Sequence, residues 1–525
     1  MIERALTVAI VANLAGDGNR RSFGIERQLR RTCKPLRGFD KRRNFKLVIE
    51  TKRVVEVKTD GTCLHDLRFP RRCVAFRAVE AGHMLETSSA IPTYELPGPK
   101  GKSIVARERA ALTTGTKTAP IVVKQAKGLM VEDVDGNVFL DFTSGMVTAT
   151  GHAHPVVVRA IAEQAERWLF INSPDFYSPL QADVAERLAK LVPGIKGKKV
   201  FFCNSGTEAN EAAIKATRYN NPTRKRLIAF LGAFHGRTMG ANAMTASKIA
   251  QRARFTSNIP DVHHLPYASC YRCPYKMSYP SCDIWCARIL EELYFKQLIP
   301  PDEVSALFVE PIQGEGGYIV PPPEFIRVLR DVAERYGIPF VDDEVQAGMG
   351  KTGKMLAIEH HGVSANCTSL GKALGSGVAV AAQVLDADLD FGVQGAHSNT
   401  FGGNGIGLAA VKATLDVMEQ DRLVERAAEV GEYFVARLRE LQERHECIGD
   451  VRGKGLMLAV DFVTDRKSRG HDGGRRDRVL ERCFVHGLML LPAGFSAIRF
   501  TPALVVDRAQ IDRAVEVLDR SIREA

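Results

Sequence analysis

Two charged residues in this 525-residue chain have neighbours that suggest chemistry. Asp343 follows the apolar run "IPFV", and Lys372 lies about thirty residues later in "TSLGKALGSG". A carboxylate directly after a buried strand is costly unless a cation meets it. A lysine among small residues is open to close approach, and its amine forms Schiff bases with aldehydes. The two residues therefore suit an acid and an amine that contact one electron-poor ring, although a surface acid and a solvated lysine are the plain alternatives.

A third feature is a cluster of small residues in "FFCNSGTEANEAAIKATR". The pattern predicts a strand that ends at Cys203 and a helix that begins near Thr207. The backbone N–H groups of Ser205, Gly206 and Thr207 would then lie at a helix N-terminus, which favours an anion such as phosphate. An ordinary helix cap is the alternative.

An aromatic residue completes the set. Phe234, in "GAFHGRT", could lie flat on a ring, although core packing would also explain it. A phosphate cradle, an acid for a ring nitrogen, a stacking aromatic and an imine-forming lysine together match pyridoxal 5′-phosphate (PLP).

The elements that must position these residues alternate between strand and helix from about residue 198 to residue 344. Such alternation predicts an α/β fold with a mostly parallel sheet and helices on both faces. Ligands bind at the carboxyl ends of the strands in such sheets. The segments to inspect are therefore 204–207, 234–237, 310–315 and 343–346. An Asp-Gly hairpin turn is predicted at Asp135-Gly136.

The length of the chain suits about two or three domains. We predict a basic extension over residues 1–83, the N-terminal part of a small domain over 84–145, a large cofactor-binding domain over 146–405, and a C-terminal α+β small domain over 406–525.

The net charge of +11 comes almost entirely from the N-terminal segment. Residues 1–84 carry 19 lysines and arginines against 9 acids, whereas the rest carries 53 against 52. Four interpretations of this segment stay open: a wrongly assigned start, a flexible tail, a cleaved targeting segment and a nucleic-acid arm. We expect no nucleic-acid partner. No apolar run is long enough to span a membrane, so no membrane partner is expected either.

Several motifs occur in the order in which one family carries them. They are "DFTSGMVTATGHAHP", "NSGTEANEAAIKATR", "GAFHGRT", "VEPIQGEGG", "VDDEVQAGMGKTG", "SLGKALGSG", "NTFGGN", "VRGKGLM" and "IRFTPALVV". From Met84 to its end the chain resembles the class III PLP-dependent aminotransferases, the group of the 4-aminobutyrate, ornithine and acetylornithine aminotransferases. The resemblance implies a fold-type-I PLP-dependent transferase. Its large domain would contain a mostly parallel seven-stranded sheet, and a smaller α+β domain would accompany it.

The resemblance also implies roles for particular residues. Lys372 would form the imine with PLP and move the proton, and Asp343 would pair with the ring nitrogen. Gln346 would contact the phenolic oxygen, while Val345 and Phe234 would cover the two ring faces. Ser205, Gly206 and Thr207 would hold the phosphate. Thr400 would reach the phosphate of the neighbouring subunit in a homodimer, or in a dimer of dimers.

The same resemblance places substrate carboxylates on Arg237 and Arg499, because a planar guanidinium binds a carboxylate in a bidentate manner. Glu315 would cover Arg499 for donors with only a distal carboxylate and expose it for 2-oxoglutarate. A static ion pair is the alternative. The expected reaction moves an amino group from 4-aminobutyrate or another ω-amino acid to 2-oxoglutarate, giving an aldehyde or keto acid and glutamate.

The same residues are compatible with other functions. Acetylornithine or ornithine could be the donor, and a racemase could use the same scaffold. A more distant alternative is a PLP-sensing regulator with a basic DNA-binding arm.

Three residues depart from the usual family pattern. Gly405 replaces the proline of "GGNP", which would loosen the turn before the next helix. Lys351 replaces a commoner arginine, which leaves one contact at the rim of the site open. Met146 replaces isoleucine in the pocket wall.

Eleven cysteines are unevenly distributed, and four of them lie within 17 residues, in "CYRCPYKMSYPSCDIWC". The spacing of Cys270, Cys273, Cys282 and Cys286 could bind zinc, or less readily an iron–sulfur cluster. A loop of reduced cysteines packed among aromatic residues is the equal alternative. The odd total suits a reducing cytosol, so we expect a cytoplasmic protein.

Overall fold

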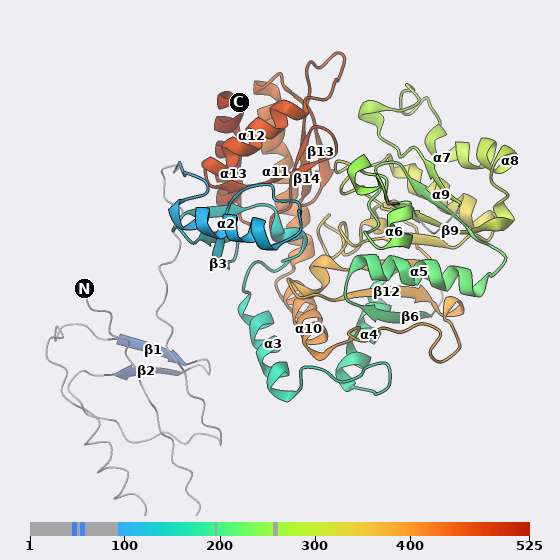
Figure 1. The fold of residues 1–525 in the computed structure, drawn as a ribbon, viewed down its shortest axis with the longest axis horizontal. Coiled ribbons are helices and arrows are strands. Elements are labelled where there is room, and N and C mark those ends of the chain that lie inside the picture. The colour runs from blue at the N-terminus through green and yellow to red at the C-terminus, as the bar shows by residue number, and fades with distance from the viewer. Residues whose placement is uncertain (1–44, 50–52, 58–92, 195–196, 256–260) are drawn as a thin grey trace, which may run out of the picture. The chain divides into compact units, whose positions relative to one another are not determined.

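The computed structural model describes residues 45–49, 53–57, 93–194, 197–255 and 261–525 (Figure 1). Contacts along the chain define two units, Met1–Glu86 and Thr87–Ala525. In the first unit, strand β1 (Phe45–Ile49) pairs antiparallel with β2 (Arg53–Val57). The rest of the predicted 1–83 extension lies outside the described residues. No described helix has the length and apolar character that a membrane crossing needs.

A seven-stranded sheet forms the centre of the second unit. Its order is β6 (Lys198–Cys203), β12 (Ala381–Asp386), β11 (Cys367–Leu370), β10 (Phe340–Asp343), β9 (Val304–Val309), β7 (Arg226–Phe230) and β8 (Val262–Leu265). The strands from β11 to β8 run parallel. β12 runs antiparallel to both of its neighbours. The predicted seven-stranded, mostly parallel sheet is confirmed, with β12 as the exception.

Alternating side chains on these strands face two helical layers. Leu227 and Ala229 of β7 pack in one apolar cluster with Ile214 of α5 (Gly206–Asn220). Ile228 and Phe230 belong to the main core, which also contains the apolar face of α9 (Pro323–Arg335). Successive side chains on a strand point to opposite faces, so this division places α5 and α9 on opposite sides of the sheet. All six residues of β9 are buried, as expected for a strand covered on both faces.

Two smaller sheets lie outside the large one. The first has the order β15 (Leu488–Met489), β5 (Val138–Asp141), β4 (Met130–Asp133) and β3 (Val123–Lys127). The second has the order β13 (Ile448–Lys454), β14 (Met457–Phe462), β17 (Ala497–Phe500) and β16 (Leu491–Ala493). The predicted hairpin at Asp135-Gly136 joins β4 to β5, and Gly136 has a φ of +92°. The domain boundaries predicted at residues 145 and 405 stay predictions.

The remaining helices complete the second unit (Figure 1). They are α2 (Pro99–Ala111), α3 (Pro155–Arg167), α4 (Pro179–Leu191), α6 (Met239–Met244), α7 (Trp285–Ile289), α8 (Phe295–Gln297), α10 (Gly405–Gln420), α11 (Leu423–Arg444), α12 (Gly473–Val485) and α13 (Arg508–Glu524). Asn404 caps α10 by accepting a hydrogen bond from the Gly407 N–H group. Gly405 lies under the Trp168 ring, because a Cβ atom there would come within 2.4 Å of an indole carbon. Only glycine fits this contact, so the missing proline has a packing reason.

Candidate active site

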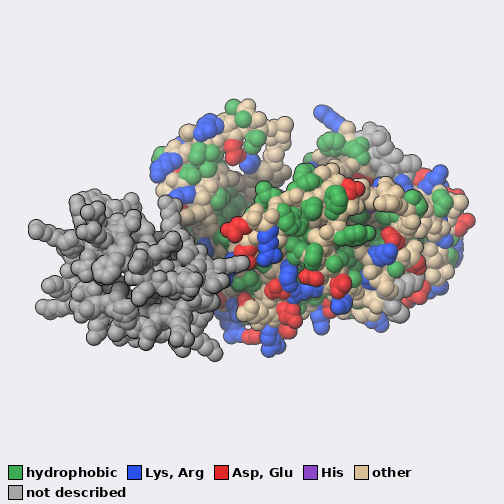
Figure 2. Space-filling model, turned by 90° about the horizontal axis from the view of Figure 1, so that it is seen from below, with side chains coloured by type: hydrophobic (Ala, Val, Ile, Leu, Met, Phe, Trp, Pro, Cys, Tyr) green, Lys and Arg blue, Asp and Glu red, His purple; other side chains and the backbone are tan. Residues whose placement is uncertain are grey.

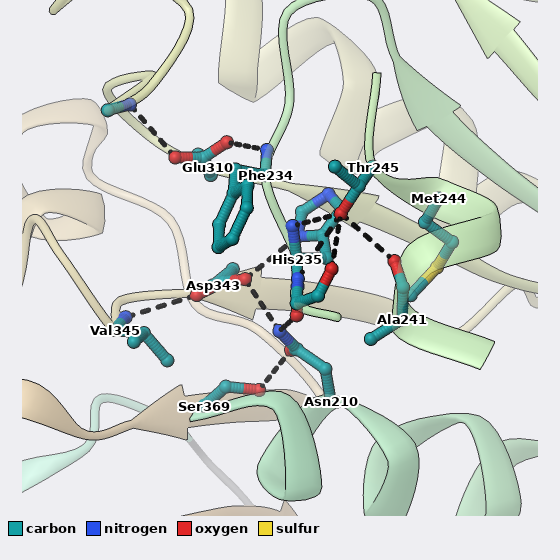
Figure 3. A network of polar contacts seen from close by, with 12 residues as sticks. Asn210, Phe234, His235, Ala241, Met244, Thr245, Glu310, Asp343, Val345 and Ser369 are labelled. Carbon is teal, nitrogen blue, oxygen red and sulfur yellow. Dashed lines mark hydrogen bonds and ion pairs between the residues drawn. The ribbon is translucent and has the colours of Figure 1, made fainter. Parts of the chain in front are cut away.

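The predicted acid lies where the sheet topology places it. Asp343 ends β10, and its side chain is 4% exposed. Its Oδ2 atom accepts hydrogen bonds from Asn210 Nδ2 (2.7 Å) and His235 Nδ1 (2.8 Å), and Oδ1 accepts from the Val345 N–H group (3.1 Å). Figure 3 shows these contacts converging on the carboxylate from three different elements. The fold therefore provides this buried carboxylate with hydrogen-bond donors, which a buried charged group requires.

His235 is the neighbour that contacts this carboxylate inside the protein. Burial alone would lower the pKa of His235, but the hydrogen bond to Asp343 and the charges of Asp343 and Glu310 outweigh it, so the pKa is raised. The carboxylate thus favours the protonated form of the imidazole. His235 Nε2 has no hydrogen-bond partner among the described residues.

Lys372 follows β11 directly and opens a short 3₁₀ turn, Lys372–Gly375. Its φ of +44° lies in the left-handed region, which is strained for a residue with a side chain. Burial lowers the pKa of Lys372 below its usual value, against the charges of Asp343, Glu315 and Glu310. A lowered pKa increases the uncharged amine at neutral pH, which is the form that reacts with an aldehyde or takes up a proton.

The predicted phosphate residues open α5. The helix begins at Gly206, and Ser205 precedes it in an extended conformation without capping it. A Cβ atom on Gly206 would lie 2.5 Å from Val345 Cγ1, so glycine lets the helix N-terminus approach the segment after Asp343. Thr207 Oγ1 lies 2.7 Å from Thr238 Oγ1, in the loop that follows Phe234. The structure thus brings Ser205, Gly206 and Thr207 together with the predicted ring-binding residues.

Three further predicted residues lie at the same place. The Asp343 carboxylate lies between the Phe234 ring and Val345 in Figure 3. Gln346 is buried, and its Oε1 atom has no partner among the described residues. Gly314 leaves room for this amide, because a Cβ atom there would lie 2.5 Å from Gln346 Oε1. An orphaned buried amide at a ligand site is the kind of group that a ligand satisfies.

Glu310 links two walls of the site. Its Oε1 atom accepts from the Phe234 N–H group and its Oε2 atom from the Gly314 N–H group, both at 2.9 Å. Burial raises the pKa of Glu310 to about 7, with the His235 charge acting against this shift. Figure 3 shows the Glu310 carboxylate beside the Phe234 backbone nitrogen, so Glu310 holds Phe234 in place through the Phe234 main chain.

The predicted substrate residues form an ion pair on one side of the site. Arg499, on β17, is 8% exposed, and its Nη1 atom lies 2.5 Å from Glu315 Oε1. Lys248 Nζ lies 3.7 Å from Glu315 Oε2. The pKa of Glu315 is lowered: burial would raise it, but the charge and hydrogen bond of Arg499 outweigh burial. Glu315 is thus an ionised acid held by two cations.

Arg237 and Thr400 are both exposed. The guanidinium of Arg237 lies over the Phe234 ring, 5.6 Å from its centroid. Thr400 lies in the loop before α10, where the neighbouring Asn399 donates to the Phe202 carbonyl (2.9 Å). Among the described residues, no hydrogen bond joins Thr400 to a predicted cofactor residue of its own chain. Its predicted role belongs to a neighbouring subunit and stays a prediction.

A protein-family model with the description "Aminotransferase class-III" matches residues 112–522 of this chain. The chain belongs to the class III aminotransferases. The alanine/serine racemase of Pyrococcus horikoshii is 38% identical over 438 residues, which cover 82% of this chain and 91% of the racemase. The diaminobutyrate–2-oxoglutarate aminotransferase of Haemophilus influenzae is 34% identical over 77% of this chain and 91% of its own. A PLP-bound amine transaminase from an uncultivated Pseudomonas species has a TM-score of 0.73 and 29% identity, over 79% of this chain and 98% of its own.

Family membership confirms the predicted fold type I and the predicted cofactor, PLP. The residues also fit PLP on their own geometry. The helix N-terminus at Gly206 suits a phosphate, Asp343 suits a protonated ring nitrogen, and the free amide oxygen of Gln346 is available for a polar ring substituent. In this class III aminotransferase, Ser205, Gly206 and Thr207 would hold the phosphate, and Lys372 would hold the aldehyde carbon.

Four residues of the site were missed by sequence reasoning: Asn210, His235, Lys248 and Glu310. His235 directly follows Phe234 in "GAFHGRT", and this position is the signal that could have found it. Asn210 lies one helical turn into α5, and its distance from Asp343 in sequence gives no indication of contact. Glu310 lies directly after β9, at the carboxyl end of a strand, and this position is its signal.

Lys351 is not at the rim of the site, which corrects the sequence-based expectation. Its side chain is 1% exposed, and Nζ donates to the Pro502 carbonyl (2.8 Å). Burial lowers the pKa of Lys351 to about 7. Met146, in contrast, is buried at the edge of the core, as a wall residue would be.

The four clustered cysteines line one small cavity together with Tyr275, Tyr279 and Trp285. All four are free thiols. Burial raises the pKa of Cys286 to about 12, with the other three cysteines adding to the shift. Within the described ranges no group of three or more His, Cys, Asp or Glu side chains is placed to hold a metal ion. The four thiols thus share one cavity, and both the reduced cysteine loop and the zinc site stay predictions.

Proposed function

We propose that this class III aminotransferase moves an amino group from an amino-acid donor to 2-oxoglutarate, with 4-aminobutyrate or another ω-amino acid as the favoured donor. The observation that carries the proposal is the Glu315–Arg499 ion pair, at 2.5 Å. An arginine that is masked by an acid can serve two substrates of different shape. Such a site leaves a donor without an α-carboxylate undisturbed and binds a diacid once Glu315 moves away.

Lys248 supports this exchange. It lies 3.7 Å from the second oxygen of Glu315 and is about two-fifths exposed. Because Lys248 is partly exposed, it offers Glu315 a cationic partner on the solvent side when Glu315 leaves Arg499. This partner lowers the free-energy cost of moving the charged carboxylate. The alternative of a static ion pair stays open.

The residues of the chain divide the chemistry between them. Bound at this site, PLP supplies the electron sink that accepts the electrons left when a substrate carbon loses a proton. The Asp343 carboxylate, held by His235 and Asn210, keeps a negative charge where a protonated ring nitrogen would lie. The Lys372 amine, with its lowered pKa, takes the proton from the substrate carbon and returns it. Arg499 and Arg237 would orient the substrate by its carboxylates.

We also propose a homodimer. Large hydrophobic side chains are exposed around the end of α3 and in the loop of Thr400, namely Leu169, Phe170, Phe176, Tyr177 and Phe401. The rings of Phe170 and Phe401 contact each other at a tilted angle, with ring centroids 5.5 Å apart. Figure 2 shows hydrophobic side chains gathered on the face that it views. An exposed apolar area of this kind next to Thr400 suits a second copy that receives Thr400 at its phosphate.

Racemisation or epimerisation of an α-amino acid is the second candidate. The Pyrococcus horikoshii racemase is more similar to this chain, at 38% identity, than the Haemophilus influenzae aminotransferase, at 34%. Removal by Lys372 of a proton from the carbon that carries the amino group would begin either reaction, and return of a proton to the other face of that carbon would give the opposite enantiomer.

A donor screen separates the two candidates. The purified protein with PLP is incubated with 4-aminobutyrate, ornithine, acetylornithine or diaminobutyrate and 2-oxoglutarate, and glutamate is measured. In parallel, single enantiomers of α-amino acids are incubated without an oxo acid, and optical purity is measured by chiral chromatography. Glutamate formation supports the transaminase. Loss of optical purity without glutamate formation supports the racemase and rejects the transaminase.

A further inference from the structure

The cysteine-rich loop contacts the C-terminal sheet through the two residues between Cys270 and Cys273. Arg272 forms a bidentate ion pair with Asp461 on β14, at 2.9 Å and 3.2 Å. The Asp461 side chain is 3% exposed and that of Arg272 is 20% exposed. A bidentate, largely desolvated pair fixes both partners in position.

Tyr271 adds a second contact to this junction. The guanidinium groups of Arg272 and Arg469 both lie over its ring, each 4.9 Å from the ring centroid. Gly449 leaves room for the phenol, because a Cβ atom there would lie 2.4 Å from the Tyr271 hydroxyl. The loop is therefore fitted to the C-terminal sheet by shape as well as by charge.

Asp461 also holds Arg452, which reaches the loop that carries Glu315. Arg452 Nη1 lies 2.8 Å from Asp461 Oδ2 and 2.9 Å from Asp450 Oδ2. Arg452 Nε donates to the Gly317 carbonyl at 2.9 Å, two residues after Glu315. The Glu315 carbonyl itself accepts from the Gly494 N–H group at 2.9 Å. The backbone at Glu315 and just after it is thus tied to the C-terminal sheet and to the turn between β16 and β17.

The charges in this network balance, since Arg272 and Arg452 face Asp450 and Asp461. Without Arg272, the two carboxylates would share a single cation. Arg452 would then be drawn towards them, and its hydrogen bond to the neutral Gly317 carbonyl would weaken, because a hydrogen bond to a charged acceptor is stronger.

We propose that Arg272 is a positioning residue for the Glu315–Arg499 ion pair, acting through Asp461 and Arg452 on the Gly317 backbone. This inference rests on the proposed function, in which Glu315 moves away from Arg499 for substrates with an α-carboxylate. Loss of Arg272 loosens the 314–318 segment, so Glu315 leaves Arg499 more readily.

The first test measures the segment itself. Hydrogen–deuterium exchange is followed in the peptide that contains residues 314–318, in the holoenzyme of the wild type, Arg272→Ala and Arg288→Ala. Arg288 is a matched control, because it lies in the same part of the chain and pairs only locally with Asp283 (3.0 Å). We expect exchange about three- to tenfold faster in Arg272→Ala and unchanged in Arg288→Ala. Equal exchange in the two variants would overturn the proposal.

The second test measures substrate choice. The ratio of kcat/KM for glutamate to kcat/KM for 4-aminobutyrate is compared in the wild type, Arg272→Ala, Glu315→Gln and the double variant. We expect Arg272→Ala to raise the ratio about three- to tenfold, and to add nothing in the Glu315→Gln background, because coupled residues are not additive. An additive effect, or no effect in the single variant, contradicts the inference.

The two tests separate the inference from the function on which it rests. If Glu315→Gln leaves the ratio unchanged while exchange still rises in Arg272→Ala, the proposed substrate exchange is wrong and the positioning role stands. If Arg272→Ala does not fold, Arg272→Lys replaces it, since lysine keeps the charge but not the bidentate geometry. This variant must shift exchange and ratio in the same directions, and no shift would overturn the proposal.

Discussion

The Nδ1 atom of His235 lies 2.8 Å from Asp343 Oδ2, and both side chains are buried. His235 is therefore part of the site although it would not contact the cofactor itself. It contacts the Asp343 carboxylate, whose charge the cofactor ring would meet. The folded pKa of His235 is raised, so its proton stabilises the folded protein fully below the ordinary value of 6.5. This contribution is lost as the pH rises through the raised folded value.

Replacing this histidine tests the pair. We expect His235→Gln to weaken PLP binding about ten- to a hundredfold, because glutamine can donate a hydrogen bond but carries no charge. The dissociation constant is measured by absorbance titration of the apoprotein. His263→Gln, on edge strand β8, is the control and should bind PLP as the wild type does. Equal affinities in the two variants would show that the His235 charge has no part in cofactor binding.

The lysine assignment is tested by covalent labelling. In the holoenzyme, borohydride reduction should attach the cofactor to the peptide that contains Lys372, as read by mass spectrometry. Lys372→Arg should abolish this label and reduce turnover at least about a thousandfold, since arginine neither forms the imine nor accepts the proton. Lys354→Arg, at an exposed lysine, should keep both properties. A label on any other lysine would refute the assignment.

The close approach at the start of α5 predicts a steric effect. A Cβ atom on Gly206 would lie 2.5 Å from Val345 Cγ1, so Gly206→Ala must displace the helix N-terminus or Val345. We expect a stability loss of about 1–3 kcal/mol, typical of overpacking, and weaker PLP binding. Gly115→Ala is the control, because no atom lies within 4 Å of a Cβ atom placed there. Thermal unfolding with and without PLP measures both effects.

Buried Lys351 predicts a pH dependence of stability. The unfolded chain keeps this proton up to the ordinary pKa of 10.5, whereas the folded chain releases it at about 7. Between these values the unfolded state binds more protons, so the stability contribution of Lys351 rises with pH. The wild type should therefore gain stability over Lys351→Met between about pH 7 and pH 9, by at most about 1.4 kcal/mol per pH unit.

Urea unfolding at several pH values measures this difference. Lys354→Met, at an exposed lysine, should give no such slope. A wild-type advantage that stays constant between pH 7 and pH 9 would mean that Lys351 stays charged in the folded protein.

The elements that carry the site were predictable where local patterns decide them. The β6 strand, the small-residue turn and α5 follow one another in the sequence as they do in the fold, and the Asp-Gly turn forms the predicted hairpin. β11 and β12 were not predicted, because short apolar runs do not distinguish strands from buried helix segments. The antiparallel direction of β12 depends on the connection around Lys372, which no local pattern specifies.

Side-chain environment was harder to predict than element type. Lys351 stands in "GKTGK", a composition typical of an exposed turn, yet its side chain is buried and donates a hydrogen bond to the Pro502 carbonyl. The contact of His235 with Asp343 joins residues that are 108 positions apart. The cysteine spacing was compatible with a metal, but spacing alone does not determine how thiols point in space.

Trp168, directly after α3, limits the size of the residue that can stand at position 405, where α10 begins. The indole occupies the space in which any side chain at position 405 would begin, so a larger residue cannot be introduced there by itself. Protein engineers who change residues one position at a time would introduce a collision at the start of α10. A redesign of this turn must therefore shrink the tryptophan in the same step.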